Sequence, residues 1–233
     1  EAAMKAGNLA SALWLAAYFD DFGIGPTDLS KASEAYFYAM ALGDDKAIKR
    51  LTEIAELGVA DAEYWLGRAI LRKGRTKENT QTALTWLERA AEKEHAEALT
   101  EIALILRAGR SGAVNDEAAA KYYTRAVKAG SDIANLFLGI LYEDGIGVPR
   151  DGTQAMALYQ DAAEKGIATA QYRLGLGYNI GLGGKRDDAK ACFWLSKAMK
   201  ADSEIDALLL LTQLEAGMLL ADWDRAEALH AGK

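Results

Sequence analysis

Pairs of glycines separated by one residue are the first candidates for chemistry in this chain, because such pairs can cradle a phosphate. Gly145 and Gly147 form one pair, between two alanine-rich stretches. The same spacing recurs at Gly23 with Gly25 and at Gly181 with Gly183. A phosphate-binding loop follows a strand and occurs once, whereas these pairs keep returning. We therefore interpret them as turns in which glycine supplies the left-handed backbone that ends a helix.

Side chains that could act as nucleophiles, bases or metal ligands are few. Cys192 is the only cysteine, and His95 and His230 are the only histidines. They leave few combinations of nucleophile and base, so the sequence predicts a protein that is not an enzyme and uses no cofactor. His95 has no second histidine or cysteine at ligand spacing, which predicts no metal site and a solvated histidine. Cys192 precedes Trp194 on a predicted helix, where a buried small side chain is expected.

Charge and hydropathy exclude further classes of function. The chain carries 27 basic and 34 acidic residues, a net charge of −7. Such a chain repels nucleic acids and anionic membranes unless its basic residues gather on one face. Its apolar runs, such as residues 207–211, are far shorter than the roughly 20 residues of a membrane-spanning helix. We expect no nucleic-acid partner and no direct membrane insertion by this segment.

The elements that position these residues follow from an internal repeat of about 36 residues. Counting from Ala134 as offset 0, Leu138 and Gly139 lie at offsets 4 and 5, and Ala170 restarts the count. The same pattern predicts repeats at residues 11–46, 62–97, 98–133, 134–169 and 170–205. Within each repeat, apolar residues at offsets 4, 8, 21, 25 and 28 are typical of two amphipathic helices. Small residues at offsets 5, 21, 28 and 29 allow close helix packing. The sequence therefore predicts an all-α fold of antiparallel helix pairs.

Three segments depart from this regular count. Residues 47–61 match only the second half of a repeat, so we expect an orphan helix of the second type there, and a change in the direction of the array. Residues 1–10 match the end of a repeat, and the chain begins on Glu1. We interpret the segment as part of a longer protein. Residues 206–233 follow the last repeat and are expected to form capping helices, with Trp223 covering the last repeat.

The residues from Ala134 to Gly166 follow the pattern A-x-x-x-LG-x-x-Y-x-x-G-x-GV-x-x-D-x-x-x-A-x-x-x-Y-x-x-AA-x-x-G. This pattern resembles the Sel-1-like repeat, a relative of the tetratricopeptide repeat, and the resemblance covers most of the chain. It implies a right-handed α-solenoid with a C-terminal helical cap, in a bacterial member of the family. The repeat at Ala62 departs from the pattern because it lacks the Gly-x-Gly turn, and the paired cysteines of the cysteine-rich branch are missing.

The resemblance also implies a function. Members of the family are non-catalytic scaffolds that bind protein partners, in bacteria often parts of envelope, secretion or exopolysaccharide machinery. We therefore expect a scaffold or adaptor located in the periplasm or cell envelope, with the cytoplasm as the alternative. Fold-level analogy does not identify the partner.

The partner-binding surface is expected on the first helices, which line the concave face of such solenoids. By analogy with the tetratricopeptide repeat, offsets −1, 2, 6, 9 and 10 point into this face. They collect Tyr64, Arg68, Arg72, Thr100, Arg107, Leu136, Glu143, Asp144, Tyr172 and Asn179. We expect an acidic partner segment against Arg68, Arg72 and Arg107, because a guanidinium can hold a carboxylate by two hydrogen bonds, with aromatic anchors at Tyr64 and Tyr172.

Other interpretations of these residues stay open. Scattered charges are also typical of a solvated helix face. Trp14, Trp65, Tyr64 and Tyr172 could stack on sugars, which would make the chain a carbohydrate- or peptidoglycan-binding scaffold, or less plausibly a hydrolase of cell-wall-like substrates. Aromatics at helical spacing are more often core residues, and Trp86 and Trp194, which share offset 24, are expected in the core.

Overall fold

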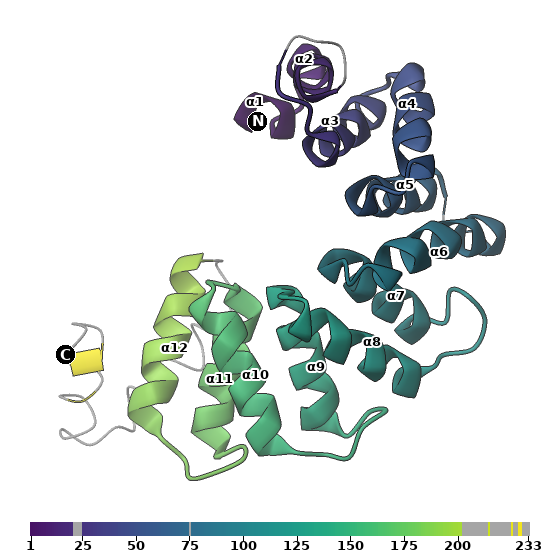
Figure 1. Cartoon of the computed structure of the whole chain (residues 1–233). Helices are drawn as coiled ribbons and strands as arrows, with labels where there is room; N and C mark the ends of the chain where they lie inside the picture. Colours follow the sequence, from purple (N-terminus) through teal and green to yellow (C-terminus); the bar gives the residue numbers. More distant parts are fainter. Residues whose placement is uncertain (21–24, 75, 202–213, 215–224, 226–227, 230–233) are drawn as a thin grey trace. The chain divides into compact units, whose positions relative to one another are not determined.

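A computed structural model describes residues 1–20, 25–74 and 76–201 together with residues 214, 225, 228 and 229 (Figure 1). In these residues the regular elements are all helices, which confirms the predicted all-α class. The chain divides into two compact units, Glu1–Ala129 and Gly130–Lys233. The helical cap expected over residues 206–233 and Trp223 lies outside the described residues.

The first unit contains α1 (Ala2–Lys5), α2 (Leu9–Phe19), α3 (Leu29–Ala41), α4 (Asp45–Glu56), α5 (Ala60–Lys73), α6 (Lys77–Glu92), α7 (Ala96–Arg107) and α8 (Asp116–Lys128). The second contains α9 (Asp132–Asp144), α10 (Gly152–Glu164), α11 (Ala168–Ile180) and α12 (Asp188–Ala201). Successive helices pack against each other: α2 with α3, α5 with α6, α7 with α8, α9 with α10 and α11 with α12. These are the helix pairs that the repeat predicts.

Helix starts are fixed by side chains that accept orphan backbone N–H groups. Asp151 shows this most fully: its Oδ1 accepts from the backbone N–H of Thr153 and of Gln154, both at 3.0 Å. The Gln154 side chain in turn donates to Asp151 Oδ2 at 3.2 Å. Asp151 and Gln154 therefore cap α10 together, with the glutamine reaching the carboxylate of Asp151 and not its backbone.

The Gly-x-Gly segments are turns, as predicted. Gly145 ends α9 and Gly181 ends α11, with φ of 70° and 73° in the left-handed region. Gly147 and Gly183 also have positive φ, of 68° and 70°. Side chains rarely adopt this backbone, which explains the use of glycine. Gly23 lies outside the described residues.

The helix pairs pack through glycine at offset 5 against the side chain at offset 25. A Cβ atom at Gly139 would lie 2.6 Å from Cε1 of Tyr159, and one at Gly67 would lie 2.8 Å from Cγ of Leu87. The first helix can approach the second only because these positions lack a side chain. Trp194 and Cys192 are buried, as predicted, and Trp86 is half-buried against the core of the first unit.

The segment expected to hold an orphan helix, residues 47–61, includes most of α4, which begins two residues earlier at Asp45, and the first two residues of α5. Helix α3 packs against both α4 and α5, and α4 packs against α5. Three successive helices thus contact one another here, unlike the simple pairs of the later repeats. The assignment of α4 as a second-type helix, and a change of direction at this point, stay predictions.

Candidate functional site

A hollow of about 300 Å³ in the first unit is lined by three helices. Phe37 comes from α3, Arg68, Leu71 and Arg72 come from α5, and Glu101 comes from α7. Two of the three arginines predicted to contact an acidic partner therefore meet in one pocket. Among the described residues, neither Arg68 nor Arg72 makes an ion pair with a carboxylate.

Aromatic rings hold Arg68 in place. Its guanidinium carbon lies 5.4 Å from the ring centre of Phe37, 5.7 Å from that of Tyr64 and 5.3 Å from that of Trp65. Its Nη1 also donates to the Tyr64 hydroxyl at 3.2 Å. These contacts stabilise the cation without neutralising it, because a ring face attracts positive charge but carries no net charge. Arg72, one helical turn later, is exposed to solvent.

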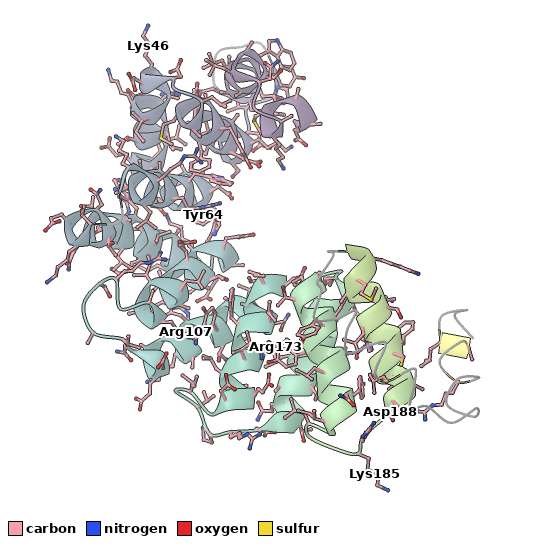
Figure 2. All side chains as sticks on the ribbon, turned by 180° about the vertical axis from the view of Figure 1, so that it is seen from behind. Lys46, Tyr64, Arg107, Arg173, Lys185 and Asp188 are labelled. Atoms are coloured by element: carbon pink, nitrogen blue, oxygen red, sulfur yellow. The ribbon has the colours of Figure 1, made fainter. Side chains whose placement is uncertain are left out.

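Tyr64 contacts Arg68 but does not line the pocket, and it is not an exposed anchor. Only 7% of it is accessible, and its ring stacks on His95 with centroids 4.8 Å apart. Burial raises the pKa of the Tyr64 hydroxyl, although Arg68 opposes the shift. Tyr64, labelled in Figure 2, therefore lies outside the pocket lining and positions Arg68 through its hydroxyl.

His95 is not the solvated side chain that the sequence suggested, because only 9% of its side chain is exposed. Its Nδ1 accepts the backbone N–H of Ala98 at 3.2 Å and so caps α7. Its Nε2 lies 3.2 Å from Oδ1 of Asp61, and this contact holds the pKa of Asp61 below its ordinary value. The sequence could not show this role because histidine is an uncommon helix cap.

Arg107 and Thr100, also predicted on this face, lie on α7. Thr100 is buried, and its hydroxyl donates to the carbonyl of Ala96 at 2.8 Å. Arg107 Nε lies 3.5 Å from Asp116 Oδ1 (Figure 2). Burial raises the pKa of Tyr123 to about 12, against the opposing effect of Arg107. Arg107 is therefore already engaged within the repeat, and it does not line the pocket.

In the second unit the predicted residues have separate environments. Leu136 is buried in the core, and Tyr172 is half-buried against the cluster that contains Ala189. Asn179 is half-buried, and Asp144 is exposed at the end of α9. Tyr64, Thr100 and Leu136 share offset 2, so burial at this offset recurs in both units. Neighbouring helices of the same unit cover the side chains at offset 2, so these side chains are not open to a partner.

Glu143, the remaining predicted residue, belongs to a cluster that sequence reasoning missed. Its carboxylate accepts from the hydroxyl of Tyr159 and from Nη1 of Arg173 at 3.1 Å, with the side chain only 17% exposed. Burial, with help from Glu143, raises the pKa of Tyr159 well above its ordinary value. Glu143 is thus already neutralised and is not a free acidic contact.

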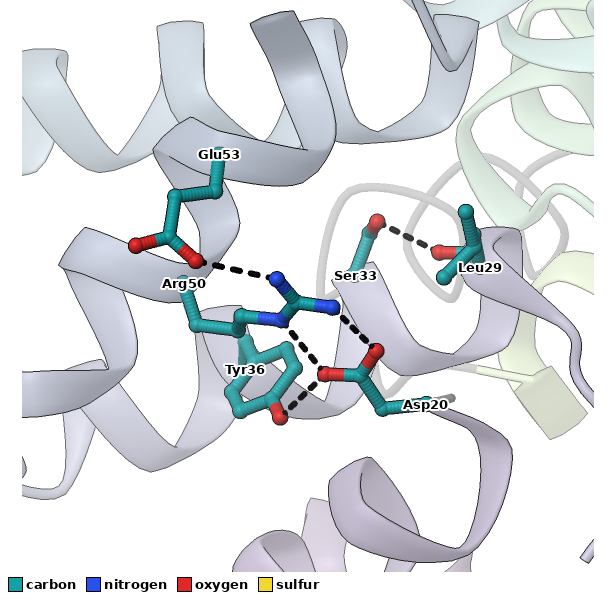
Figure 3. Close-up of polar contacts among 6 residues, drawn as sticks. All are labelled: Asp20, Leu29, Ser33, Tyr36, Arg50 and Glu53. Carbon is teal, nitrogen blue, oxygen red and sulfur yellow. Dashed lines mark hydrogen bonds and ion pairs between the residues drawn. The ribbon is translucent and has the colours of Figure 1, made fainter. Parts of the chain in front are cut away.

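The same cluster occurs in the first unit with the same spacing (Figure 3). Asp20, whose side chain has no exposed surface, accepts from the Tyr36 hydroxyl at 2.7 Å and from Nε and Nη2 of Arg50, each at 2.7 Å. In both clusters the tyrosine follows the acid by 16 residues and the arginine follows it by 30. An acid at offset 9 with a tyrosine at offset 25 was the available sequence signal.

The pocket lies at the corresponding positions of the repeat that begins at Ala62. There Leu71 replaces the acid, Leu87 replaces the tyrosine, and Glu101 replaces the arginine. Because two leucines cannot form the polar cluster, no carboxylate of this repeat occupies the place beside Arg68 and Arg72. The repeats at Ala98 and Ala170 also lack an acid at offset 9, where they carry Arg107 and Asn179. In the repeat at Ala62, leucines stand at both the acid and the tyrosine positions of the cluster, and Leu71 lines the pocket.

Two further observations bear on chemistry. Among the described residues no group of three or more His, Cys, Asp and Glu side chains could hold a metal ion, and no helix is long and apolar enough to cross a membrane. Of the aromatics considered for sugar stacking, Trp14 is 60% exposed and stacks on Tyr18 with centroids 5.1 Å apart. Trp65 packs against the core of the first unit.

Comparison with known proteins identifies relatives. The family model for the Sel1 repeat matches residues 60–95, 96–131, 132–167 and 168–203. Protein sel-1 homolog 2 of Rattus norvegicus is 35% identical over 137 residues, which cover 59% of this chain and 18% of that protein. The chain thus spans less than a fifth of this relative.

Solved structures show the same fold. The chain resembles c5321, a protective antigen of uropathogenic Escherichia coli strains with an SLR fold, at a TM-score of 0.70 and 24% identity over 97% of this chain and 53% of that one. It also resembles a Sel1 repeat protein of Oxalobacter formigenes at a TM-score of 0.63 and 25% identity, over 97% of this chain and 86% of that one. These likenesses confirm the expected helix-pair solenoid.

Proposed function

Because the chain belongs to the Sel1 repeat family, whose repeats mediate protein interactions, we propose that it is a non-catalytic scaffold that binds an acidic segment of a partner protein in the pocket of Arg68 and Arg72. The observation that carries this proposal is a pair of arginines in one hollow with no acidic ion-pair partner among the described residues. Of the described residues that line the hollow, Glu101 is the one acid.

Electrostatics supports an anionic occupant. Two guanidinium groups in one half-enclosed hollow repel each other, and a carboxylate placed between them relieves this repulsion. Arginine suits the role because its planar fork can hold a carboxylate by two hydrogen bonds. The rings around Arg68 hold its guanidinium at one place, so less side-chain freedom is lost on binding.

Photo-crosslinking tests where the partner binds. A photoreactive amino acid replaces exposed Lys73, which follows Arg72 on α5, in one variant and exposed Lys121, on α8, in a control variant. The proposal expects a crosslinked protein at position 73 that is absent at position 121, with the crosslink mapping to an acidic segment. Equal crosslinking at both positions, or a crosslink at 73 to a basic segment, contradicts it.

The scaffold is further proposed to serve cell-envelope, secretion or exopolysaccharide assembly, from the periplasm or cell envelope. This placement depends on the resemblance to bacterial members of the family. Fractionation of cells that express the tagged, full-length gene product tests it. Recovery in the cytoplasmic fraction alone would favour the alternative compartment.

A carbohydrate-binding scaffold is the second candidate, and one observation favours it. Exposed Trp14 borders a second hollow, which Asn8, Ser11 and Leu15 also line. An aromatic face beside polar side chains can stack on a sugar ring. A glycan array compared between the wild type and Trp14→Ala decides the matter, because a sugar-binding role requires a signal that the substitution abolishes. Turnover of a glycoside would instead point to the hydrolase alternative.

A further inference from the structure

The pocket presents three kinds of surface within about 300 Å³. Arg68 and Arg72 supply hydrogen-bond donors with positive charge, and Glu101 supplies acceptors with negative charge. Phe37 and Leu71 are 6% and 8% exposed, and the surface that they keep open lines the pocket and is apolar. An occupant that satisfies all of them carries a carboxylate, a hydrogen-bond donor and an apolar group close together.

Glu101 restricts which ligands can bind in the pocket. It stands at the offset where two other repeats carry Arg50 and Arg173, so the charge at this position is inverted. A purely acidic occupant would be repelled by Glu101, whereas a donor beside the carboxylate can bind to it. No ion pair joins Glu101 to another described residue, which leaves its acceptors available to a ligand.

We propose that the pocket receives the C-terminal residue of the partner chain, and that this residue has an apolar side chain. This inference rests on the proposed function and names the part of the partner that binds. A C-terminal residue carries a carboxylate, an amide N–H and a side chain on one Cα atom. Its carboxylate binds Arg68 and Arg72, its N–H donates to Glu101, and its side chain packs on Phe37 and Leu71.

An internal aspartate or glutamate fits less well. Its carboxylate stands one or two methylene groups away from its own backbone, and its own side chain supplies no apolar group. The chain would also continue on both sides, so two segments would have to leave a hollow of about 300 Å³. A terminus leaves it once and fixes the direction of the partner.

The test is a titration followed by NMR of the arginine Nε–H groups, which reads weak binding directly. The probes are acetyl-Gly-Gly-Leu with a free carboxylate, the same peptide as its C-terminal amide, and acetyl-Gly-Glu-Leu-amide, which carries only an internal acid. The free acid is expected to shift the Nε–H signals of Arg68 and Arg72 and to bind about tenfold more tightly than either amide, a factor that corresponds to 1.4 kcal/mol.

Variants fix the assignment. Arg72→Gln changes an exposed side chain, so the fold is not at risk, and it should reduce the affinity for the free acid about tenfold. Glu101→Gln should weaken the same probe several-fold, because an amide oxygen is a weaker acceptor than a carboxylate. The matched control Lys121→Glu, on the exposed face of α8, should leave binding unchanged.

Three results overturn the inference: equal binding of the free acid and its amide, equal or tighter binding of the internal-acid peptide, or no shift of either arginine signal at saturating probe. After either of the first two results the scaffold proposal still holds if Arg72→Gln weakens binding of the crosslinked partner. If Arg72→Gln leaves the partner's affinity unchanged, the proposed function fails as well, so the two failures are distinguishable.

Discussion

The cluster of Asp20, Tyr36 and Arg50 offers a direct test of how neighbouring helices are held together (Figure 3). Replacing Tyr36 by Phe removes one hydroxyl and keeps a ring that is only 7% exposed. The lost bond, 2.7 Å to a carboxylate, belongs to the charged class that contributes about 1.5–3 kcal/mol. Asp20 keeps both bonds from Arg50, so the carboxylate is not orphaned and the expected cost lies near the lower limit, about 1.5–2 kcal/mol.

Removing the carboxylate is expected to cost more. Asp20→Ala leaves the Tyr36 hydroxyl and two donors of Arg50 without their acceptor. Breaking a buried ion pair in this way costs about 3–5 kcal/mol. Arg50 is 32% exposed, so water replaces part of the lost interaction and the lower limit, about 3 kcal/mol, is expected. In the double variant Asp20→Ala with Tyr36→Phe, the loss of unfolding free energy should be smaller than the sum of the two single losses, because both residues belong to one network.

Native-state hydrogen exchange is the suitable assay, because a chain of repeats need not unfold in one step. The opening free energies of amides in α2, α3 and α4 should fall in each variant, while those of α9–α12 serve as an internal reference. Tyr38→Phe, on the same helix, is the matched control, since no described residue bonds its hydroxyl, and it should change stability by less than about 0.5 kcal/mol. Equal effects of Tyr36→Phe and Tyr38→Phe would refute the reasoning.

Three further predictions concern single residues. The pKa of Tyr123 is raised from 10.0 to about 12, so its contribution to stability is complete below pH 10.0 and is lost as the pH rises toward 12. Tyr123→Phe should therefore reduce the alkaline loss of unfolding free energy by up to about 2.7 kcal/mol, seen as a smaller decline in melting temperature with pH, and an unchanged pH profile would contradict the shift. Gly139→Ala should lower the free energy of unfolding by about 1–2 kcal/mol in denaturant unfolding, because its Cβ would lie 2.6 Å from the Tyr159 ring. The cost of this overlap exceeds the gain in helix propensity from alanine. A more stable variant would show that the ring can move. His95→Ala should cost about 1 kcal/mol through loss of the α7 cap, measured by thermal unfolding, and His95→Asn should restore most of it; failure of the rescue would argue against capping.

The fold could be predicted from the sequence because the repeat reports packing directly. Glycine at offset 5 and alanine at offsets 28 and 29 recur since helix pairs of one geometry are stacked again and again. Cys192 and Trp194 follow the same logic and are buried. The repeat gives no comparable information about packing at α4, because the segment that contains most of this helix matches only half a repeat, and three helices contact one another there.

The candidate site could be predicted only in part. Arg68 and Arg72 were assigned to the inner face by offset, and both line the pocket. Tyr64 received the same assignment but is buried, because an offset gives the direction of a side chain and not the neighbour that covers it. The role of Glu101 depends on the charge pattern of other repeats at the same offset, which becomes meaningful only when the contacts of Arg50 are known.

The most direct test of the central claim is the affinity of the crosslinked partner for one double variant, measured by calorimetry. Arg68→Glu with Arg72→Glu reverses both charges of the pocket, and Lys49→Glu with Lys121→Glu makes the same change in charge at exposed positions of α4 and α8. The account predicts that the pocket variant binds at least about tenfold more weakly than the wild type, or 1.4 kcal/mol, while the control binds equally well. Equal affinity of the two double variants, with helicity intact by circular dichroism, would contradict it and place the partner elsewhere on the chain.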